Sequence, residues 1–149
     1  MIQIGTKIPE ILGKDQNGNF LKASDFVGKK IVLYFYPKDQ TPGCIAEACS
    51  FRDNLSVLQD AGYCVIGVSK DSIKSHLNFI TKQNLNFPLI SDSDMTLINY
   101  FGVWGEKKMC GKVSLGVLRT TFVIDEYGVV KHIIEKVNTK EAAQQVLTL

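Results

Sequence analysis

The sequence predicts an α/β fold, a three-layer α/β/α sandwich around a mixed central sheet that is preceded by an N-terminal β-hairpin. Short apolar runs typical of buried strands alternate along the chain with segments of helical periodicity. This alternation is typical of a parallel sheet covered by helices. The last two predicted strands are joined by a tight turn rather than by a helix, so the sheet is expected to be mixed.

Length and composition restrict the classes of protein that the chain can belong to. Its 149 residues have the size of one domain, and no linker or repeat divides them, so a single domain over residues 1–149 is expected. A net charge of +2 is too small to imply a nucleic-acid partner. No apolar run approaches the roughly 18 residues of a membrane span, and we expect no membrane association. The first residues lack the layout of a secretory signal, so a cytoplasmic location is expected.

The first strands are marked by a turn and by their composition. Residues 11–13 and 20–21 flank Asn17-Gly18, and Asn-Gly is the strongest short hairpin signal. Residues 31–36 form a continuous β-branched and aromatic run, typical of a strand buried on both faces. Sites in such folds lie at the carboxyl ends of the strands, so the segment after residue 36 is expected to carry one.

Helical periodicity begins just after this segment. A helix is expected from Thr41 or Cys44 to Asp60, because the residues that share a face with Cys44 are apolar, namely Ala48, Phe51, Leu55 and Leu58. A second helix is expected from a cap at Asp71 or Ser72 to about residue 84, with Ile73, Leu77 and Ile80 on its buried face. The other expected elements are strands over 63–69, 87–90, 120–124 and 129–135, a helix over 94–101, and a last helix that opens with the capping stretch over residues 138–141 and runs to about Leu147.

Residues 37–49 are the most informative stretch. Cys44 follows a turn and begins the expected helix, where the helix dipole and the unpaired amides favour a thiolate, the nucleophilic form of cysteine. Thr41 is expected to place a hydroxyl beside the sulfur, and Pro37 restricts the loop. Glu47 is expected in the first helical turn, where its charge suits the dipole. A buried core cysteine at a helix start fits this segment as well.

Cys49 lies five residues after Cys44. If both are helical, the rise is about 7.5 Å, the rotation about 140°, and the two Cα atoms lie about 8.7 Å apart. Disulfides need Cα atoms closer than about 7 Å. A bond between the two therefore either never forms or unwinds the first turns of the helix. Unwinding at a helix end fits a redox switch, and a cysteine that only packs the helix is the alternative.

The other cysteines and the histidines carry weaker signals. No C-x-x-C or H-x-x-x-H pair is present, and His76 and His132 are distant in sequence, so no metal site is expected. Both histidines are expected to be solvated or packed. Cys64 is expected to be a core strand thiol, and Cys110 a bystander thiol in a loop.

Arg119 stands at the start of the expected strand over residues 120–124. A guanidinium is permanently charged and forks toward an anion. Brought beside Cys44, it would favour the thiolate and hold a polar substrate with two oxygens. Taken alone, an arginine at this place is better interpreted as a surface residue at a strand start.

These residues together resemble a known family. The pattern Pro37-x-x-x-Thr41-x-x-Cys44, with Arg119 ahead of a buried strand, resembles the peroxiredoxins. The string over residues 34–49, which ends at Cys49, resembles the bacterioferritin-comigratory, or peroxiredoxin Q, branch in particular. The resemblance implies a thioredoxin-like fold.

The resemblance also implies a role for each residue. Cys44 would be the peroxidatic cysteine and Cys49 the resolving cysteine of the same chain, while Pro37, Thr41 and Arg119 would complete the peroxide pocket. The implied enzyme is a thiol peroxidase that reduces hydrogen peroxide and organic hydroperoxides through a sulfenic acid and a Cys44–Cys49 disulfide. Thioredoxin or a similar dithiol would then restore both thiols, without a metal or another cofactor.

Two further expectations follow from this implied cycle. Resolution within one chain removes the need for a dimer, so a monomer is expected. A thiol–disulfide oxidoreductase or redox relay is the alternative function, since it would use the same two cysteines and need no peroxide pocket.

Overall fold

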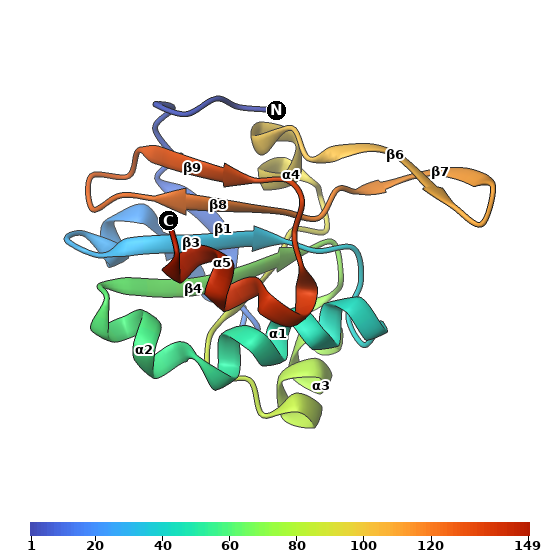
Figure 1. Ribbon diagram of the computed structural model, residues 1–149, viewed down its shortest axis with the longest axis horizontal. Coiled ribbons are helices and arrows are strands. Elements are labelled where there is room, and N and C mark those ends of the chain that lie inside the picture. The colour runs from blue at the N-terminus through green and yellow to red at the C-terminus, as the bar shows by residue number, and fades with distance from the viewer.

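In the computed structural model, which describes residues 1–149 apart from the side chain of Met109, the chain folds around one seven-stranded sheet (Figure 1). Its strands are β1 (Ile11–Lys14), β2 (Phe20–Lys22), β3 (Lys30–Phe35), β4 (Tyr63–Ser69), β5 (Leu89–Ser91), β8 (Thr120–Ile124) and β9 (Val130–Ile134). Their order in the sheet is β2-β1-β5-β4-β3-β8-β9. The central β3, β4 and β5 are parallel, and the other pairs are antiparallel. The predicted mixed sheet is confirmed.

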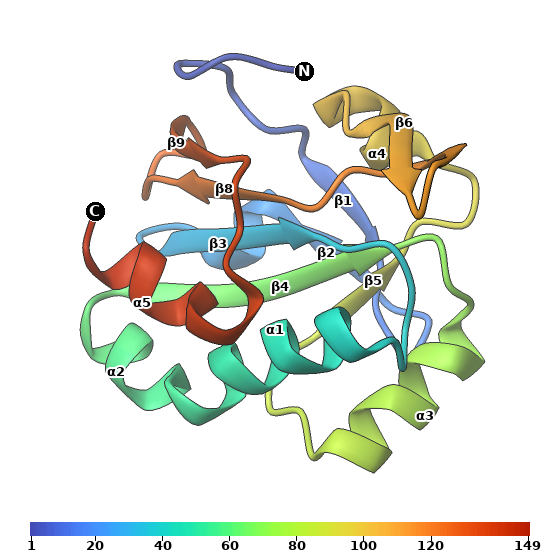
Figure 2. The same cartoon turned by 45° about the vertical axis from the view of Figure 1, so that its right-hand side comes forward.

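Helices cover both faces of the sheet (Figure 2). The helices on one face are α1 (Pro42–Asp53), α2 (Leu55–Asp60), α3 (Ile73–Gln83) and α5 (Ala142–Leu147), the last preceded by a short 3-10 turn, η2 (Thr139–Glu141). The other face is covered by α4 (Thr96–Phe101), by the N-terminal segment and by the 3-10 turn η1 (Ala23–Phe26). Tyr34 of β3 packs toward the first face and Phe35 toward the second, which explains why this strand is apolar at every position.

The helix expected from residue 41 to residue 60 is two helices in the structure. The break falls at Asn54, whose φ and ψ angles are −114° and 12°. Its side-chain amide donates to the carbonyl oxygen of Ser50 at 2.8 Å, and asparagine side chains compete in this way with the helical ladder. Apolar periodicity continues across the break, since Leu55 and Leu58 are both buried, and it therefore gave no sign of the break.

A second, two-stranded sheet was missed by the sequence prediction. β6 (Trp104–Met109) and β7 (Lys112–Val117) form a hairpin that projects from the body of the molecule (Figure 1), where only a loop around Cys110 was expected. The strands are rich in lysine and lack an apolar run. Their two-residue turn has positive φ at both Cys110 and Gly111, a conformation normally signalled by Asn-Gly.

The second long helix also differs in detail from the prediction. α3 is capped by Ser72, whose hydroxyl accepts from the amide of Ser75, as one of the two predicted caps. Its buried residues are His76 and Phe79, whereas Leu77 is exposed.

In the described part of the chain, no helix is both long and apolar enough to cross a membrane.

Candidate active site

Cys44 lies at the carboxyl end of the parallel strands, as the sequence predicts. The chain leaves β3, makes a short loop over residues 36–41 and enters α1, with Cys44 as the third helical residue. Pro42 occupies the first helical position, where a missing N–H costs no hydrogen bond. The thiol is buried, with the residue 1% exposed, so its sulfur meets protein groups rather than bulk water.

The structure brings Arg119 to this thiol. β8 pairs antiparallel with β3, and Thr120 faces Phe35, so the residue before β8 stands beside the end of β3. Nη2 of Arg119 lies 3.5 Å from Sγ of Cys44 and donates a hydrogen bond to it. A Cβ at residue 43 would lie 3.0 Å from Nη2, so Gly43 leaves room for the guanidinium.

Glu47 completes the cluster and was not predicted there. Nη1 of Arg119 donates to Oε1 of Glu47 at 2.7 Å, and the carboxyl group is fully buried. Because α1 begins at Pro42, Glu47 lies in the second turn and not, as expected, in the first. Its three-residue spacing from Cys44, which places both on one helical face, was the available signal. A single acidic residue on an otherwise apolar helical face is easily interpreted as a side chain exposed to solvent.

The environment of Glu47 disfavours its charge. Burial raises the pKa of the Glu47 carboxyl, the nearby Arg119 lowers it, and the net result is a pKa of about 7 against the ordinary 4.5. Within the described residues, Oε2 of Glu47 and the hydroxyl of Tyr34 are buried without a hydrogen-bond partner. Burial lowers the pKa of Arg119, but its interactions with Glu47 and Cys44 outweigh this effect, and the net shift is upward.

This pKa predicts a pH-dependent contribution of Glu47 to stability. An acid whose folded pKa exceeds its unfolded pKa takes up protons on folding between the two values, so stability falls as the pH rises from 4.5 to about 7. We expect the difference in unfolding free energy, wild type minus Glu47→Gln, to fall by up to about 3 kcal/mol over this range. Urea unfolding at several pH values measures it. A difference that stays constant with pH would contradict the prediction.

Thr41 and Pro37 lie in the loop that leads to Cys44. The Thr41 hydroxyl donates to the carbonyl oxygen of Lys38 at 2.8 Å, a bond that orders the loop, so its proposed place beside the sulfur stays a prediction. Pro37 lines a groove of about 500 Å³ between this loop and the β6–β7 hairpin. Lys70, Trp104 and Lys107 also line the groove, which gives it basic and aromatic walls.

Cys49 lies in the same unbroken helix as Cys44, and both are free thiols. Its Sγ is partly buried and lies 3.9 Å from Oε1 of Gln83 at the end of α3. Arg52, one turn further on, donates from Nη1 to the carbonyl oxygen of Gln83 at 2.6 Å. Because both cysteines lie in one intact helix, they cannot form a disulfide with each other in this structure.

The remaining cysteines stand apart from this cluster. Cys64 is partly buried in β4, where burial raises the pKa of its thiol to about 11 and makes it a poor nucleophile. Cys110 is exposed at the tip of the β6–β7 hairpin. His132 is exposed on β9, whereas His76 is buried.

A buried thiol at the N-terminus of a helix, hydrogen-bonded to a guanidinium at the carboxyl end of a thioredoxin-like sheet, can act as a nucleophile on a small polar substrate. This combination defines a thiol-based redox enzyme. The comparisons with known proteins give the family. The model of the AhpC/TSA family matches residues 4–133.

Individual relatives agree with that match. The chain is 44% identical to peroxiredoxin Bcp of Bacillus subtilis over 98% of this chain and 93% of the relative. A structure of the bacterioferritin comigratory protein of Xanthomonas campestris covers 96% of both chains, with 37% identity and a TM-score of 0.84. Peroxiredoxin Q of Xylella fastidiosa is 35% identical, covers 99% of this chain and 94% of its own, and has a TM-score of 0.89.

The chain therefore belongs to the AhpC/TSA family of peroxiredoxins and, within it, to the bacterioferritin-comigratory or peroxiredoxin Q branch. It is a thiol peroxidase with a thioredoxin-like fold, as the sequence analysis expected.

Proposed function

We propose that Cys44 is the peroxidatic cysteine of this enzyme. The observation that carries the proposal is the 3.5 Å hydrogen bond from Arg119 to its sulfur at the start of α1. The thiolate attacks one peroxide oxygen, the O–O bond breaks, and Cys44 becomes a sulfenic acid while water or an alcohol leaves. Arg119 stabilises charge on the departing oxygen, and Thr41 and Pro37 complete the pocket.

Cys49 is the resolving cysteine in this proposal. Its sulfur attacks the sulfenic acid and expels water, which leaves a Cys44–Cys49 disulfide. A thioredoxin-type dithiol then reduces that bond by exchange. The helix between the two sulfurs must open first, because an intact α1 keeps them apart.

The remaining features of the proposal concern the setting of the enzyme. Residues 1–149 act as one domain, as a monomer, in the cytoplasm, and without a metal or another cofactor. The substrates are hydrogen peroxide and organic hydroperoxides. The bacterioferritin comigratory protein of Xanthomonas campestris is described by its alkyl peroxide reduction activity, which supports the organic substrates.

A thiol–disulfide relay between proteins is the alternative. It would use Cys44 and Cys49 but has no need of a guanidinium placed to stabilise a leaving oxygen. Peroxide-dependent oxidation of thioredoxin by the purified protein tests the choice directly. Exchange with protein disulfides in the absence of peroxide turnover would favour the relay.

Arg119→Met tests the role of the guanidinium. We expect the rate constant for oxidation of Cys44 by hydrogen peroxide to fall at least about tenfold, because loss of an electrostatic donor at a reacting oxygen typically costs 10²–10³ in rate. Alkylation of Cys44 at neutral pH should also slow. Arg52→Met is the matched control, since it removes the other arginine, which contacts Gln83. Equal rates in the wild type and Arg119→Met would show that the guanidinium does not assist the reaction of Cys44 with peroxide.

A further inference from the structure

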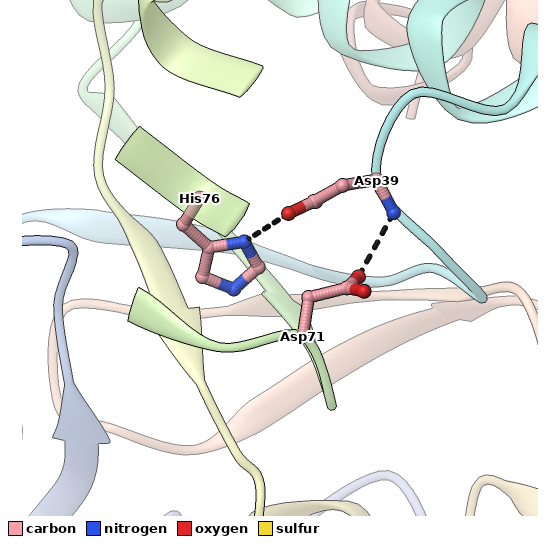
Figure 3. A group of neighbouring side chains, drawn as sticks. All are labelled: Asp39, Asp71 and His76. Carbon is pink, nitrogen blue, oxygen red and sulfur yellow. Dashed lines mark hydrogen bonds and ion pairs between the residues drawn. The ribbon is translucent and has the colours of Figure 1, made fainter. Parts of the chain in front are cut away.

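A buried polar network lies behind the loop that leads to Cys44 (Figure 3). Asp39, from this loop, and His76, from α3, are both buried, and Nδ1 of His76 lies 2.7 Å from Oδ2 of Asp39. The amide of Asp39 donates to Oδ2 of Asp71 at 2.8 Å. The loop is thus fastened at one residue through both its side chain and its backbone.

Both carboxyl oxygens of Asp39 accept hydrogen bonds from neighbouring side chains. Oδ1 accepts from the hydroxyl of Tyr36 at 2.6 Å, and Oδ2 accepts from the hydroxyl of Ser75 at 2.8 Å and also lies 2.7 Å from Nδ1 of His76. Burial raises the pKa of Tyr36 far above its ordinary value, so the phenol keeps the proton that it donates. The network joins the end of β3 to the start of α3.

Both ring nitrogens of His76 face acceptors. Nε2 lies 3.0 Å from the carbonyl oxygen of Ile90 in β5, and a carbonyl oxygen can only accept. Nδ1 faces Oδ2 of Asp39 on the other side, so the contacts of both nitrogens fix the orientation of the ring. The cluster of Asp39, Asp71 and His76 has a geometry that could hold a metal ion, but these bonds already occupy the ring nitrogens and the carboxylate oxygens that face one another.

The segment after this anchor is strained. Gln40 has a φ of 64°, a left-handed conformation that few residues other than glycine adopt. Such residues persist where their surroundings over-determine them. Thr41, the next residue, caps α1 with its carbonyl oxygen, which accepts from the amide of Ile45 at 2.8 Å. The place at which α1 begins, and with it the place of Cys44, thus depends on how Asp39 is held.

We propose that the hydrogen-bonded pair of His76 and Asp39 positions the peroxidatic thiol. The pair holds the loop on α3 and β5, keeps Gln40 in its strained conformation and starts α1 where Cys44 meets Arg119. His76 touches no substrate in this scheme and is a positioning residue. After each opening of the helix, the same anchor returns the segment to the reactive geometry. This inference rests on the proposed role of Cys44.

Two substitutions of His76 test its hydrogen bonds to Asp39 and to Ile90 one at a time. The side-chain nitrogen of asparagine stands the same number of bonds from Cβ as Nδ1, and that of glutamine the same number as Nε2. His76→Asn therefore keeps a donor toward Asp39, whereas His76→Gln keeps one toward Ile90. Glutamine is the better helix former, so a purely structural role would favour the glutamine variant.

The measurement is the rate constant for oxidation of reduced protein by hydrogen peroxide, followed by quenched flow and intact mass. We expect His76→Gln to be at least about tenfold slower, since small displacements of reacting groups cost up to about 10²-fold, and His76→Asn to stay within about threefold of wild type. Amide exchange over residues 39–44 should quicken in His76→Gln alone. Wild-type rates in folded His76→Gln, or equal slowing in both variants, would overturn the proposal.

Asp92→Asn serves as the stability control. Its buried carboxyl accepts from the amides of Leu97 and Ile98 in the first turn of α4, on the other face of the sheet. If Asp92→Asn and His76→Gln lose the same amount of melting temperature and are slowed to the same extent, the slowing reflects lost stability and the proposal is overturned. If His76→Gln does not fold, Ser75→Ala replaces it, with an expected slowing of about threefold and faster exchange over residues 39–44. An unchanged rate and exchange in that variant count against the anchor.

A further variant, Cys44→Ser, distinguishes failure of this proposal from failure of the proposed function. If Cys44→Ser still consumes peroxide, the role of Cys44 is wrong whatever the His76 variants do. If Cys44→Ser is inactive and His76→Gln reacts like the wild type, only the anchor is wrong.

Discussion

Cys44→Ser should abolish peroxide consumption in the presence of a thioredoxin-type reductant. A serine hydroxyl is a far weaker nucleophile than a cysteine sulfur at neutral pH, and no other group at the start of α1 can replace the thiolate. The substitution replaces the sulfur with an oxygen and changes the size of the side chain little. Arg119 and Glu47 retain their own 2.7 Å ion pair, so the fold should survive.

Cys64→Ser and Cys110→Ser are the matched controls for this experiment. Each removes a thiol outside the cluster, one partly buried in β4 and one exposed at the hairpin tip. Both should turn over peroxide at close to the wild-type rate. Activity of Cys44→Ser within threefold of wild type would show that another group is the nucleophile.

The sequence was sufficient to locate the thiol, because the signals for its position are local. The apolar run over residues 31–36, the proline that follows it and the helical spacing after Cys44 each depend on neighbours in the chain. They fix a strand, a loop and a helix start, and hence place Cys44 at the carboxyl edge of the sheet. Arg119 was linked to that edge by resemblance, and the antiparallel register of β3 and β8 supplies the physical reason.

What the sequence could not show depends on contacts between distant segments. Asp39 and His76 are separated by 37 positions, and neither carries a local signal for a buried pair. The burial of Glu47 requires Arg119, 72 positions away, as its partner. The β6–β7 hairpin was missed for another reason, since its strands contain no continuous apolar run and its turn uses a cysteine where Asn-Gly is usual.

Two attachments flank the part of α1 that would open in the proposed cycle. Asp39 fastens the loop before the helix to α3, and Arg52 fastens its last turn to the carbonyl oxygen of Gln83. Cys44 and Cys49 lie between these two attachments. Helix ends open at the lowest free energy, so unwinding is expected to begin at residue 42 and to stop before Arg52.

Cys49→Ser tests this switch and should stop the catalytic cycle after one turnover. In the wild type, one equivalent of peroxide should give a Cys44–Cys49 disulfide and a mass lower by about 2 Da than that of the reduced protein. In Cys49→Ser, Cys44 should react once with peroxide and remain a sulfenic acid that excess peroxide oxidises further. Intact mass and peptide mapping after one equivalent of peroxide distinguish the two products, and Cys110→Ser should behave as the wild type.

Amide exchange provides the structural half of the same test. In a helix the two Cα atoms lie about 8.7 Å apart, beyond the limit of about 7 Å for a disulfide, so the oxidised wild type must lose helix between them. Exchange over residues 42–49 should therefore be faster in the oxidised than in the reduced protein, and unchanged at Asp53. If the oxidised wild type carries an added oxygen and no Cys44–Cys49 bond, Cys49 is not the resolving thiol. The cycle would then depend on an external thiol or on Cys110, whose serine variant would fail to turn over.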